Sequence, residues 1–367
     1  MKKIAVVMMA IVMVLGLALT ACQPQTVVQT VEVEKTVVVE KAVEKTVVVE
    51  VEKPAEAAEA PKVAPGELRI ALLLDGPIND QGWNQGAYDG LAAVKTKYLA
   101  DVAYSESVAR ADMEAAFTDY AARGYNIIFA HGFEFSDAAE KVAAQFPDTI
   151  FVVTHGKAGL TGDNIATIQY EEEQIGFLLG ILAGKMTKSN KVAAIGGYEI
   201  PPIAIPFKAF ELGAKEVNPN VAVSISWIDS WTDIAKMKEA ANAAIATGAD
   251  VIFPVASGAS PGGLYAAAEA GVWGIGYSGD QYIFAPDVTL SSGIVDTGLS
   301  IELVVDEIVN GTFKATDYWY GLKDNVVRLA PYHNTEDKIP QDVKDTVAEW
   351  TQKILSGEYE VPIKMEF

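Results

Sequence analysis

From Glu67 onward, short apolar runs alternate with amphipathic segments. Residues 68–74 form the first run, and the segment after it carries Ala87, Leu91, Val94 and Tyr98 on one helical face. Continuous apolar runs are typical of parallel strands that are buried on both faces. The same alternation predicts further strands near residues 102–105, 126–130, 150–153 and 165–169, with helices over 112–122 and 136–145.

A second unit begins after a helix predicted over residues 171–186, because the alternation restarts with the apolar run 192–197. A single core stops growing at about 250–300 residues, so a domain over residues 67–367 is expected to divide into two doubly wound parallel-sheet lobes. Ligands of such folds bind beyond the carboxyl ends of the strands. This unit has predicted strands at 221–227, 251–254, 273–276 and 289–292, and predicted helices at 203–217 and 233–246.

The N-terminus has the order of a bacterial secretion signal. Lys2 and Lys3 precede an apolar stretch over residues 4–19, and small residues then lead into Cys22. A membrane-spanning helix needs about 20 apolar residues with flanks that hold it. The pattern instead predicts a signal peptide over residues 1–21 and a lipid anchor on Cys22. Cys22 is the only cysteine, so no disulfide is expected.

Residues 22–66 are of low complexity and predict a tether between the lipid and the folded domain. Residues 34–40 recur as 44–50, each copy carrying three consecutive valines, and an Ala/Pro/Glu-rich run follows. Such a repeat can also pair as strands or form a helical coil between copies. The absence of turn residues and of a varied core favours a tether.

Charge limits the classes of ligand. The formal net charge of −21 argues against nucleic acid, whose phosphates require a cationic surface. It makes a neutral or cationic ligand easier to accommodate, although the acidity also fits a solvated surface that has no bearing on the ligand.

Catalytic and cofactor motifs are poorly supported, and we expect no enzyme, cofactor or metal. Residues 274–279 match G-x-G-x-x-G, but no helix follows to direct its N-terminus at a pyrophosphate. Residues 180–185 resemble a phosphate loop only superficially, since Met186 replaces the hydroxyl residue and the segment is predicted to be helical. His131 and His155 each end an apolar strand, where a histidine is more often a polar rim residue than a base or ligand.

The loop after the first strand, residues 75–85, is the most informative for binding. It is rich in hydrogen-bonding groups and contains Trp83. The indole either fastens the following helix to the sheet or stacks on a flat ligand, and composition leaves both open. Comparable loops over 131–137, 196–207 and 257–260 follow later strands.

These segments together resemble the basic membrane protein family of substrate-binding lipoproteins. The resemblance rests on residues 75–84, 132–137, 171–184, 191–197, 207–213 and 280–281. It implies the type I periplasmic-binding-protein fold, with two lobes joined by a hinge, and service to an ABC importer. It also implies a purine base held between aromatic rings of the two lobes, here Trp83 and Phe207, with polar contacts from Asp75, Asp80, Asn84 and Asp137.

Two departures from that family put a ribose contact in doubt. Ser278 stands where the family often has aspartate, and Asp296 follows the next strand where the family has lysine. A nucleoside, a free base or another small aromatic or polyol ligand therefore remains open.

The resulting hypothesis is a monomeric, lipid-anchored extracytoplasmic protein that captures a purine nucleoside or base and docks on ABC permease subunits. The alternatives are a binding protein for a sugar or other small polar ligand, a ligand-presenting sensor, and a surface nucleoside hydrolase. The first lobe is expected over about 67–170 and 283–312, and the second over about 171–282 and 313–367. The candidate ligand-binding residues are Asp75, Asn79, Asp80, Trp83, Asn84, Phe133, Asp137, Phe207, Ser257, Gly258 and Asp280.

Overall fold

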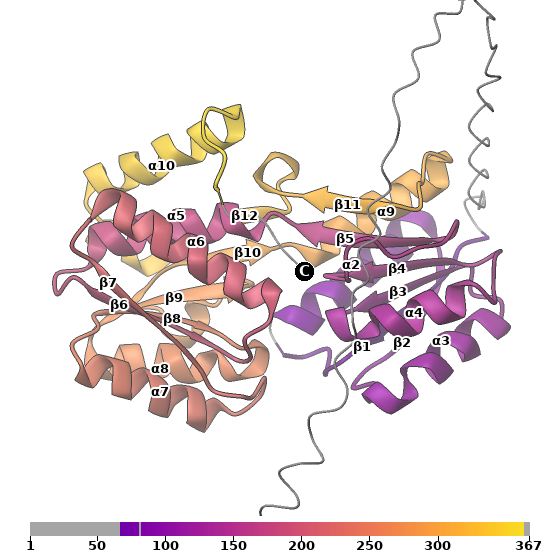
Figure 1. The fold of residues 1–367 in the computed structure, drawn as a ribbon, viewed down its shortest axis with the longest axis horizontal. Coiled ribbons are helices and arrows are strands. Elements are labelled where there is room, and N and C mark those ends of the chain that lie inside the picture. Colours follow the sequence, from indigo (N-terminus) through magenta and orange to yellow (C-terminus); the bar gives the residue numbers. More distant parts are fainter. Residues whose placement is uncertain (1–66, 81, 363–367) are drawn as a thin grey trace, which may run out of the picture. The chain divides into compact units, whose positions relative to one another are not determined.

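The computed structural model describes residues 67–80 and 82–362. The predicted signal peptide, the lipidation site Cys22 and the predicted tether lie outside the described residues. Strands and helices alternate along the described chain, as the hydrophobic pattern predicts. The strands form two six-stranded sheets, each with helices on both faces, so the fold is α/β with two doubly wound lobes (Figure 1).

The first sheet is parallel throughout, with the order β11-β5-β4-β3-β1-β2. Successive β1 side chains enter two separate cores: Leu72 belongs to one and Leu73 to the other, and both are fully buried. Burial on both faces explains why the strand sequence is continuously apolar. The strands are β1 (Arg69–Leu74), β2 (Asp101–Ser105), β3 (Ile127–His131), β4 (Ile150–Thr154), β5 (Ile165–Tyr170) and β11 (Asp317–Tyr320).

Helices cover both faces of this sheet. Helices α3 (Met113–Ala122) and α4 (Ser136–Ala143) pack together on one face, and α2 (Trp83–Tyr98) and α9 (Thr297–Asn310) pack together on the other. The first lobe is thus built largely from the N-terminal half of the domain and completed by two elements that come much later in the chain.

The second sheet has the order β12-β10-β9-β8-β6-β7, and only β12 runs antiparallel to its neighbour. Its strands are β6 (Lys191–Gly196), β7 (Ala222–Trp227), β8 (Val251–Val255), β9 (Trp273–Ser278), β10 (Thr289–Val295) and β12 (Val327–Leu329). Helices α7 (Ile234–Ala246) and α8 (Pro261–Ala270) cover one face. Helices α5 (Glu172–Met186) and α6 (Pro201–Val217) cover the other, with α10 (Gln341–Ser356) packed on α5.

The chain passes between the lobes near residues 171, 296 and 321, which corrects the predicted lobe boundaries. Residues 289–295 were expected in the first lobe, but they form β10 and pair with β9 in the second sheet. Residues 317–320 were expected in the second lobe, but they form β11 and pair with β5. The hydrophobic pattern predicts an apolar strand but not the strand with which it pairs. Only the pairing shows to which sheet the strand belongs.

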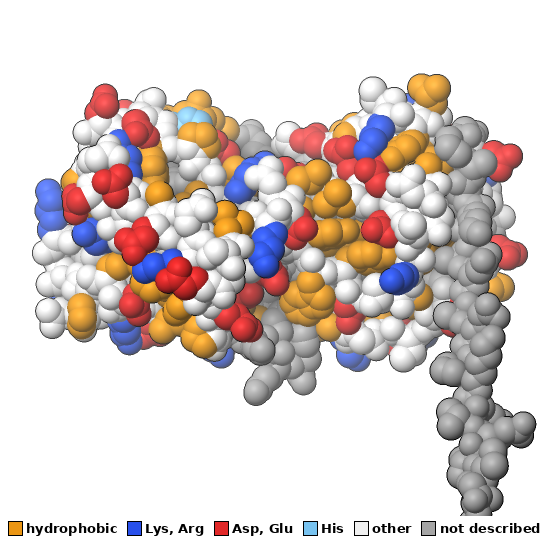
Figure 2. Space-filling view, turned by 90° about the horizontal axis from the view of Figure 1, so that it is seen from above, with side chains coloured by type: hydrophobic (Ala, Val, Ile, Leu, Met, Phe, Trp, Pro, Cys, Tyr) orange, Lys and Arg blue, Asp and Glu red, His pale blue; other side chains and the backbone are white. Residues whose placement is uncertain are grey.

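The segments in which the chain passes between the lobes, called crossovers below, contact one another. The backbone N–H of Glu171 donates to the carbonyl of Tyr320, and Leu322 N–H donates to the Gln174 side chain, both at 2.9 Å. Asp296 caps α9 and forms a 2.7 Å ion pair with Arg328. Figure 2 looks onto the side that carries α10 and β11, where acidic and basic side chains are interspersed over both lobes.

Candidate functional site

A cavity of about 570 Å³ lies between the two lobes, at the carboxyl ends of their parallel strands. The first lobe lines it with loops after β1, β3 and β4, and the second lobe with loops after β6, β7 and β8 and with the end of β9. These loops all follow the carboxyl ends of parallel strands, where ligand crevices of open α/β sheets form. Of the predicted binding residues, the cavity brings together Asp75, Asn79, Asp80, Trp83, Asn84, Phe133, Ser257 and Gly258.

Trp83, the first residue of α2, both fastens the helix to the sheet and faces the cavity. Its ring stacks on His131, with centroids 3.9 Å apart, and lies 4.5 Å from the ring of His155. The His131 Nε2 atom is 3.0 Å from the Trp83 carbonyl oxygen. Burial, and then the nearby His155, lower the pKa of His131 well below its usual range. His131 is therefore a neutral support for the indole.

The opposite wall carries aromatic residues that the sequence analysis did not single out. Tyr198 follows β6 and Trp231 follows β7, and their rings meet edge to face with centroids 5.1 Å apart. Both line the cavity, and Tyr198 is 38% exposed. Their position just after a strand of the second sheet was the available signal, the same one that marked Trp83.

Phe207 does not line this cavity, so the expected pairing of Trp83 with Phe207 across the cleft is not formed. Its side chain is fully buried and packs on Trp227 and Phe253, with both ring centroids at 5.4 Å. The physical reason is helical phase: α6 begins at Pro201, and Phe207 falls on the face that covers the sheet. Tyr198 and Trp231 occupy the second lobe's side of the slot instead.

Asp80 organises the loop before α2. It accepts hydrogen bonds from the backbone N–H groups of Gly82, Asn84 and Gln85, at 2.9 to 3.1 Å, and from the Asn84 side chain. Ser257 of the second lobe donates to it at 3.4 Å. Asp80 therefore satisfies the N-terminal donors of a helix and also contacts the other lobe.

Asp75 and Glu134 place two carboxylates at one corner of the cavity. An oxygen of each lies within 4 Å of the point where a Cβ on Gly132 would stand, at 3.8 Å for Asp75 and 3.2 Å for Glu134. Asp75 is an exposed residue by surface area, but protein atoms around its carboxyl group reduce the contact of that group with water. This desolvation and the charge of Glu134 raise the pKa of Asp75 to about 6.

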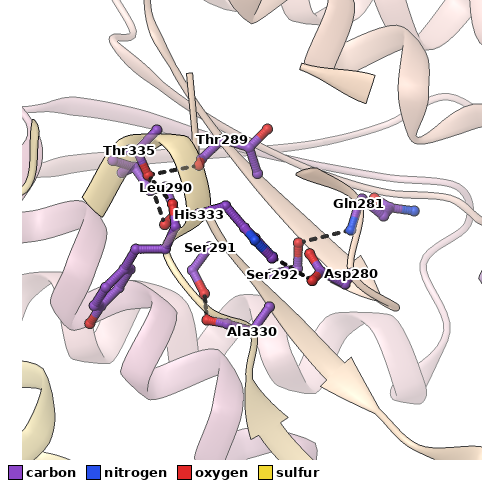
Figure 3. A network of polar contacts seen from close by, with 10 residues as sticks. Asp280, Gln281, Thr289, Leu290, Ser291, Ser292, Ala330, His333 and Thr335 are labelled. Atoms are coloured by element: carbon purple, nitrogen blue, oxygen red, sulfur yellow. Dashed lines mark hydrogen bonds and ion pairs between the residues drawn. The ribbon is translucent and has the colours of Figure 1, made fainter. Parts of the chain in front are cut away.

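Besides Phe207, two further predicted binding residues lie away from the cavity lining. Asp137 is exposed in the first turn of α4. Asp280 pairs at 2.6 Å with His333 of the short helix η6 (His333–Lys338), as Figure 3 shows, and the ring of His333 stacks on Tyr282. Asp280 therefore ties the C-terminal segment to the second sheet, while its neighbour Ser278 lines the cavity.

Glu172 and His155 join the lobes beside the crossover. Glu172 is buried at the start of α5 and lies 3.2 Å from the His155 Nε2 atom. The Tyr277 hydroxyl donates to the same carboxylate oxygen at 3.2 Å. Burial and the charge of Glu172 raise the pKa of Tyr277, so its hydroxyl stays protonated as a donor. The sequence analysis did not select Glu172 or Tyr277, because nothing in their spacing distinguishes them.

Comparison with known proteins identifies the family. The family model described as Bmp, ABC transporter substrate-binding protein PnrA-like, matches residues 67–364. The chain belongs to this family of substrate-binding proteins. The match confirms the family predicted from the sequence and covers both lobes.

Individual relatives and a solved structure support this family assignment. The chain is 30% identical over 308 residues to a purine-binding protein of Brucella abortus, covering 82% of this chain and 85% of the relative. It is 28% identical over 322 residues to the ABC transporter nucleoside-binding protein BmpA of Lactococcus lactis, covering 81% and 90%. A solved ABC transporter solute-binding protein from Conexibacter woesei superposes with a TM-score of 0.68 at 26% identity, covering 82% and 100%.

These similarities and the two parallel-dominated sheets confirm the type I periplasmic-binding-protein fold. Within residues 67–80 and 82–362, no helix has the length and apolar character that a membrane span requires.

Proposed function

We propose that this protein captures a purine nucleoside or a related base between its lobes and delivers it to the permease of an ABC importer. The observation that carries the proposal is the cavity itself, which has Trp83 on the first lobe and Tyr198 and Trp231 on the second. Aromatic walls with a few convergent polar groups suit a small flat ligand. The family supports the import role, and the names of two relatives support a purine or nucleoside.

The mechanism follows from the two-lobed architecture. Ligand bridges loops from both lobes, so it favours the arrangement in which those loops are close together. The crossovers near residues 171, 296 and 321 are where the backbone would bend. The closed form would then dock on the permease as a monomer.

We also propose that Cys22 carries the lipid that holds the protein on the extracytoplasmic face of the cell membrane. The supporting observation is the sequence around it: two lysines, an apolar stretch, and small residues leading into the only cysteine. A Cys22→Ser variant is expected to lose metabolic labelling with a fatty acid and to leave the membrane fraction. Retention in the membrane without label would contradict the lipid anchor.

Identification of the ligand tests the proposed function. The full chain, purified in mild detergent, is denatured and any released small molecule is identified by mass spectrometry. Thermal-shift titrations with nucleosides, free bases and sugars then follow. Stabilisation by a nucleoside or base is expected. Stabilisation by a sugar alone, or by none of these compounds, would overturn the purine assignment.

A further inference from the structure

His155 lies where the cavity, the first sheet and a crossover meet. It follows β4 in the first lobe and lines the cavity. Its ring centroid is 4.5 Å from that of Trp83 and 4.2 Å from that of Tyr170, the last residue of β5. Its Nε2 atom lies 3.2 Å from a carboxylate oxygen of Glu172, which begins α5 in the second lobe. One side chain thus connects the aromatic wall of the cavity with the crossover near residue 171.

The conformation of His155 has three unfavourable features. Its φ is +50°, in the left-handed region, which a residue with a side chain adopts at a cost. The residue is only 6% exposed. Its Nδ1 atom is buried and has no hydrogen-bond partner among the residues that the structure describes. Strained backbone of this kind clusters at ligand-binding and switch regions, where the surrounding structure imposes it. The three features together therefore indicate a functional role for His155.

Glu172 has polar contacts with both lobes at one oxygen atom. The Tyr277 hydroxyl, from β9 in the second lobe, donates to Oε1 at 3.2 Å, and the His155 Nε2 atom of the first lobe lies at the same distance from it. All three side chains are buried. A buried carboxylate that loses a partner is left with a desolvation cost that nothing offsets. The contact with His155 therefore favours the arrangement described above, in which both lobes line one cavity.

We propose that His155 is a positioning residue that couples the aromatic wall of the cavity to closure of the lobes. Its contact with Glu172 stabilises the closed arrangement, and its contact with Trp83 supports the ring on which the ligand stacks. Because one imidazole makes both contacts, ligand stacking and lobe closure stabilise the same conformation. The coupling to ligand rests on the proposed function, whereas the preference of the ligand-free protein for closed lobes does not.

The distance between the lobes tests this coupling. Spin labels on Ala115→Cys in α3 and Asn242→Cys in α7, both exposed positions, report the distance by double electron–electron resonance in the full chain carrying Cys22→Ser. Both helices lie on the side of the lobes away from β11 and β12 (Figure 1), so opening about the crossovers lengthens the distance. Without ligand, His155→Asn is expected to raise the ratio of open to closed molecules about three- to tenfold, the range for one buried hydrogen bond. Asparagine is chosen because it also adopts positive φ.

His333→Asn is the matched control. His333 also has a left-handed backbone, with a φ of +46°, lies 2.6 Å from the Asp280 carboxylate and stacks on Tyr282. Both of these partners belong to the second lobe, and His333 is outside the cavity lining. The control is expected to leave the distances unchanged. Glu172→Gln, which replaces one carboxylate oxygen with a donor nitrogen, should shift the distances in the same direction as His155→Asn.

Guanosine then tests the coupling to ligand. Its Kd for His155→Asn is expected to rise by the factor by which the closed population falls, and saturating guanosine should restore the shorter distance. Unchanged distances in both His155→Asn and Glu172→Gln, equal shifts in His333→Asn, or a shift without any rise in Kd would overturn the inference. If guanosine does not bind the unmodified protein, nucleoside capture fails, and the ligand-free distances alone decide the inference.

Discussion

Trp83 is the residue at which structural and binding roles overlap. The indole packs on His131 and His155 and still faces the cavity. Its position, in a polar loop directly after the first strand, was enough to select it from the sequence. The same signal marks Tyr198 and Trp231 on the opposite wall. Phe207 is buried instead, because the face of α6 that it occupies depends on where that helix begins.

Replacing Trp83 tests the aromatic wall. We expect Trp83→Ala to weaken nucleoside binding by about 1–3 kcal/mol, roughly 5- to 150-fold, because stacking on the base is lost. Trp319→Ala, a change at a 47% exposed indole outside the cavity lining, should leave Kd unchanged. Equal losses in both variants, measured by titration calorimetry, would argue against a stacking role.

Asp75 makes binding depend on pH. Its carboxylate is ionised above its raised pKa of about 6 and protonated below it. Under the proposed function the ionised form accepts a hydrogen bond from an N–H group of the purine, so guanosine is expected to bind about tenfold more weakly at pH 5 than at pH 7. Asp75→Asn should bind more weakly at pH 7 and show little change between the two pH values. An Asp75→Asn profile that still falls tenfold would assign the effect to another group.

Glycines in α5 allow the backbones of α5 and α6 to approach each other closely. A Cβ on Gly176 would stand 2.4 Å from the Pro206 carbonyl oxygen, and one on Gly180 would stand 2.1 Å from that of Phe210. Gly180 belongs to the segment that superficially resembles a phosphate loop, and its role is to let two backbones pack together. Distances below 3.0 Å to backbone atoms leave no room for a side chain.

Substitution at this helix contact should therefore affect stability and not binding. We expect Gly180→Ala to lower the free energy of unfolding by roughly 1–3 kcal/mol through overpacking, despite the better helix propensity of alanine. Gly86→Ala is the matched control in α2, since a Cβ there meets nothing within 4 Å, and should stabilise by up to about 1 kcal/mol. Urea unfolding measures both, and a stabilised Gly180→Ala would contradict the packing argument.

At the scale of helices and strands, the sequence predicted where the elements lie but not which strands pair with one another. Apolar runs and helical faces predicted the strands and helices, because burial acts on each segment separately. The assignment of β10 and β11 to sheets depends on pairing between segments far apart in the chain. Glu134 was missed for a similar reason, since only the fold brings it to Asp75.

Considered as a whole, the molecule carries a formal charge of −21, and its cavity is lined by four acids without a described lysine or arginine. The negative electrostatic potential of these charges disfavours the binding of anionic ligands. GMP is therefore expected to bind at least about tenfold more weakly than guanosine, and the difference should narrow as salt is raised, because screening weakens the repulsion. GMP affinity equal to that of guanosine at low salt would show that the phosphate lies outside this field.

The three crossovers also govern how the protein is completed. The first sheet receives its edge strand β11 only at residues 317–320, long after β5 ends at Tyr170, and the second receives β12 at residues 327–329. A chain delivered N-terminus first therefore cannot finish one lobe before the other is nearly complete. A premature stop before residue 317 would leave both sheets without an edge strand, so truncation yields no intact half. Completion of both sheets therefore depends on one short stretch of the chain, residues 317–329.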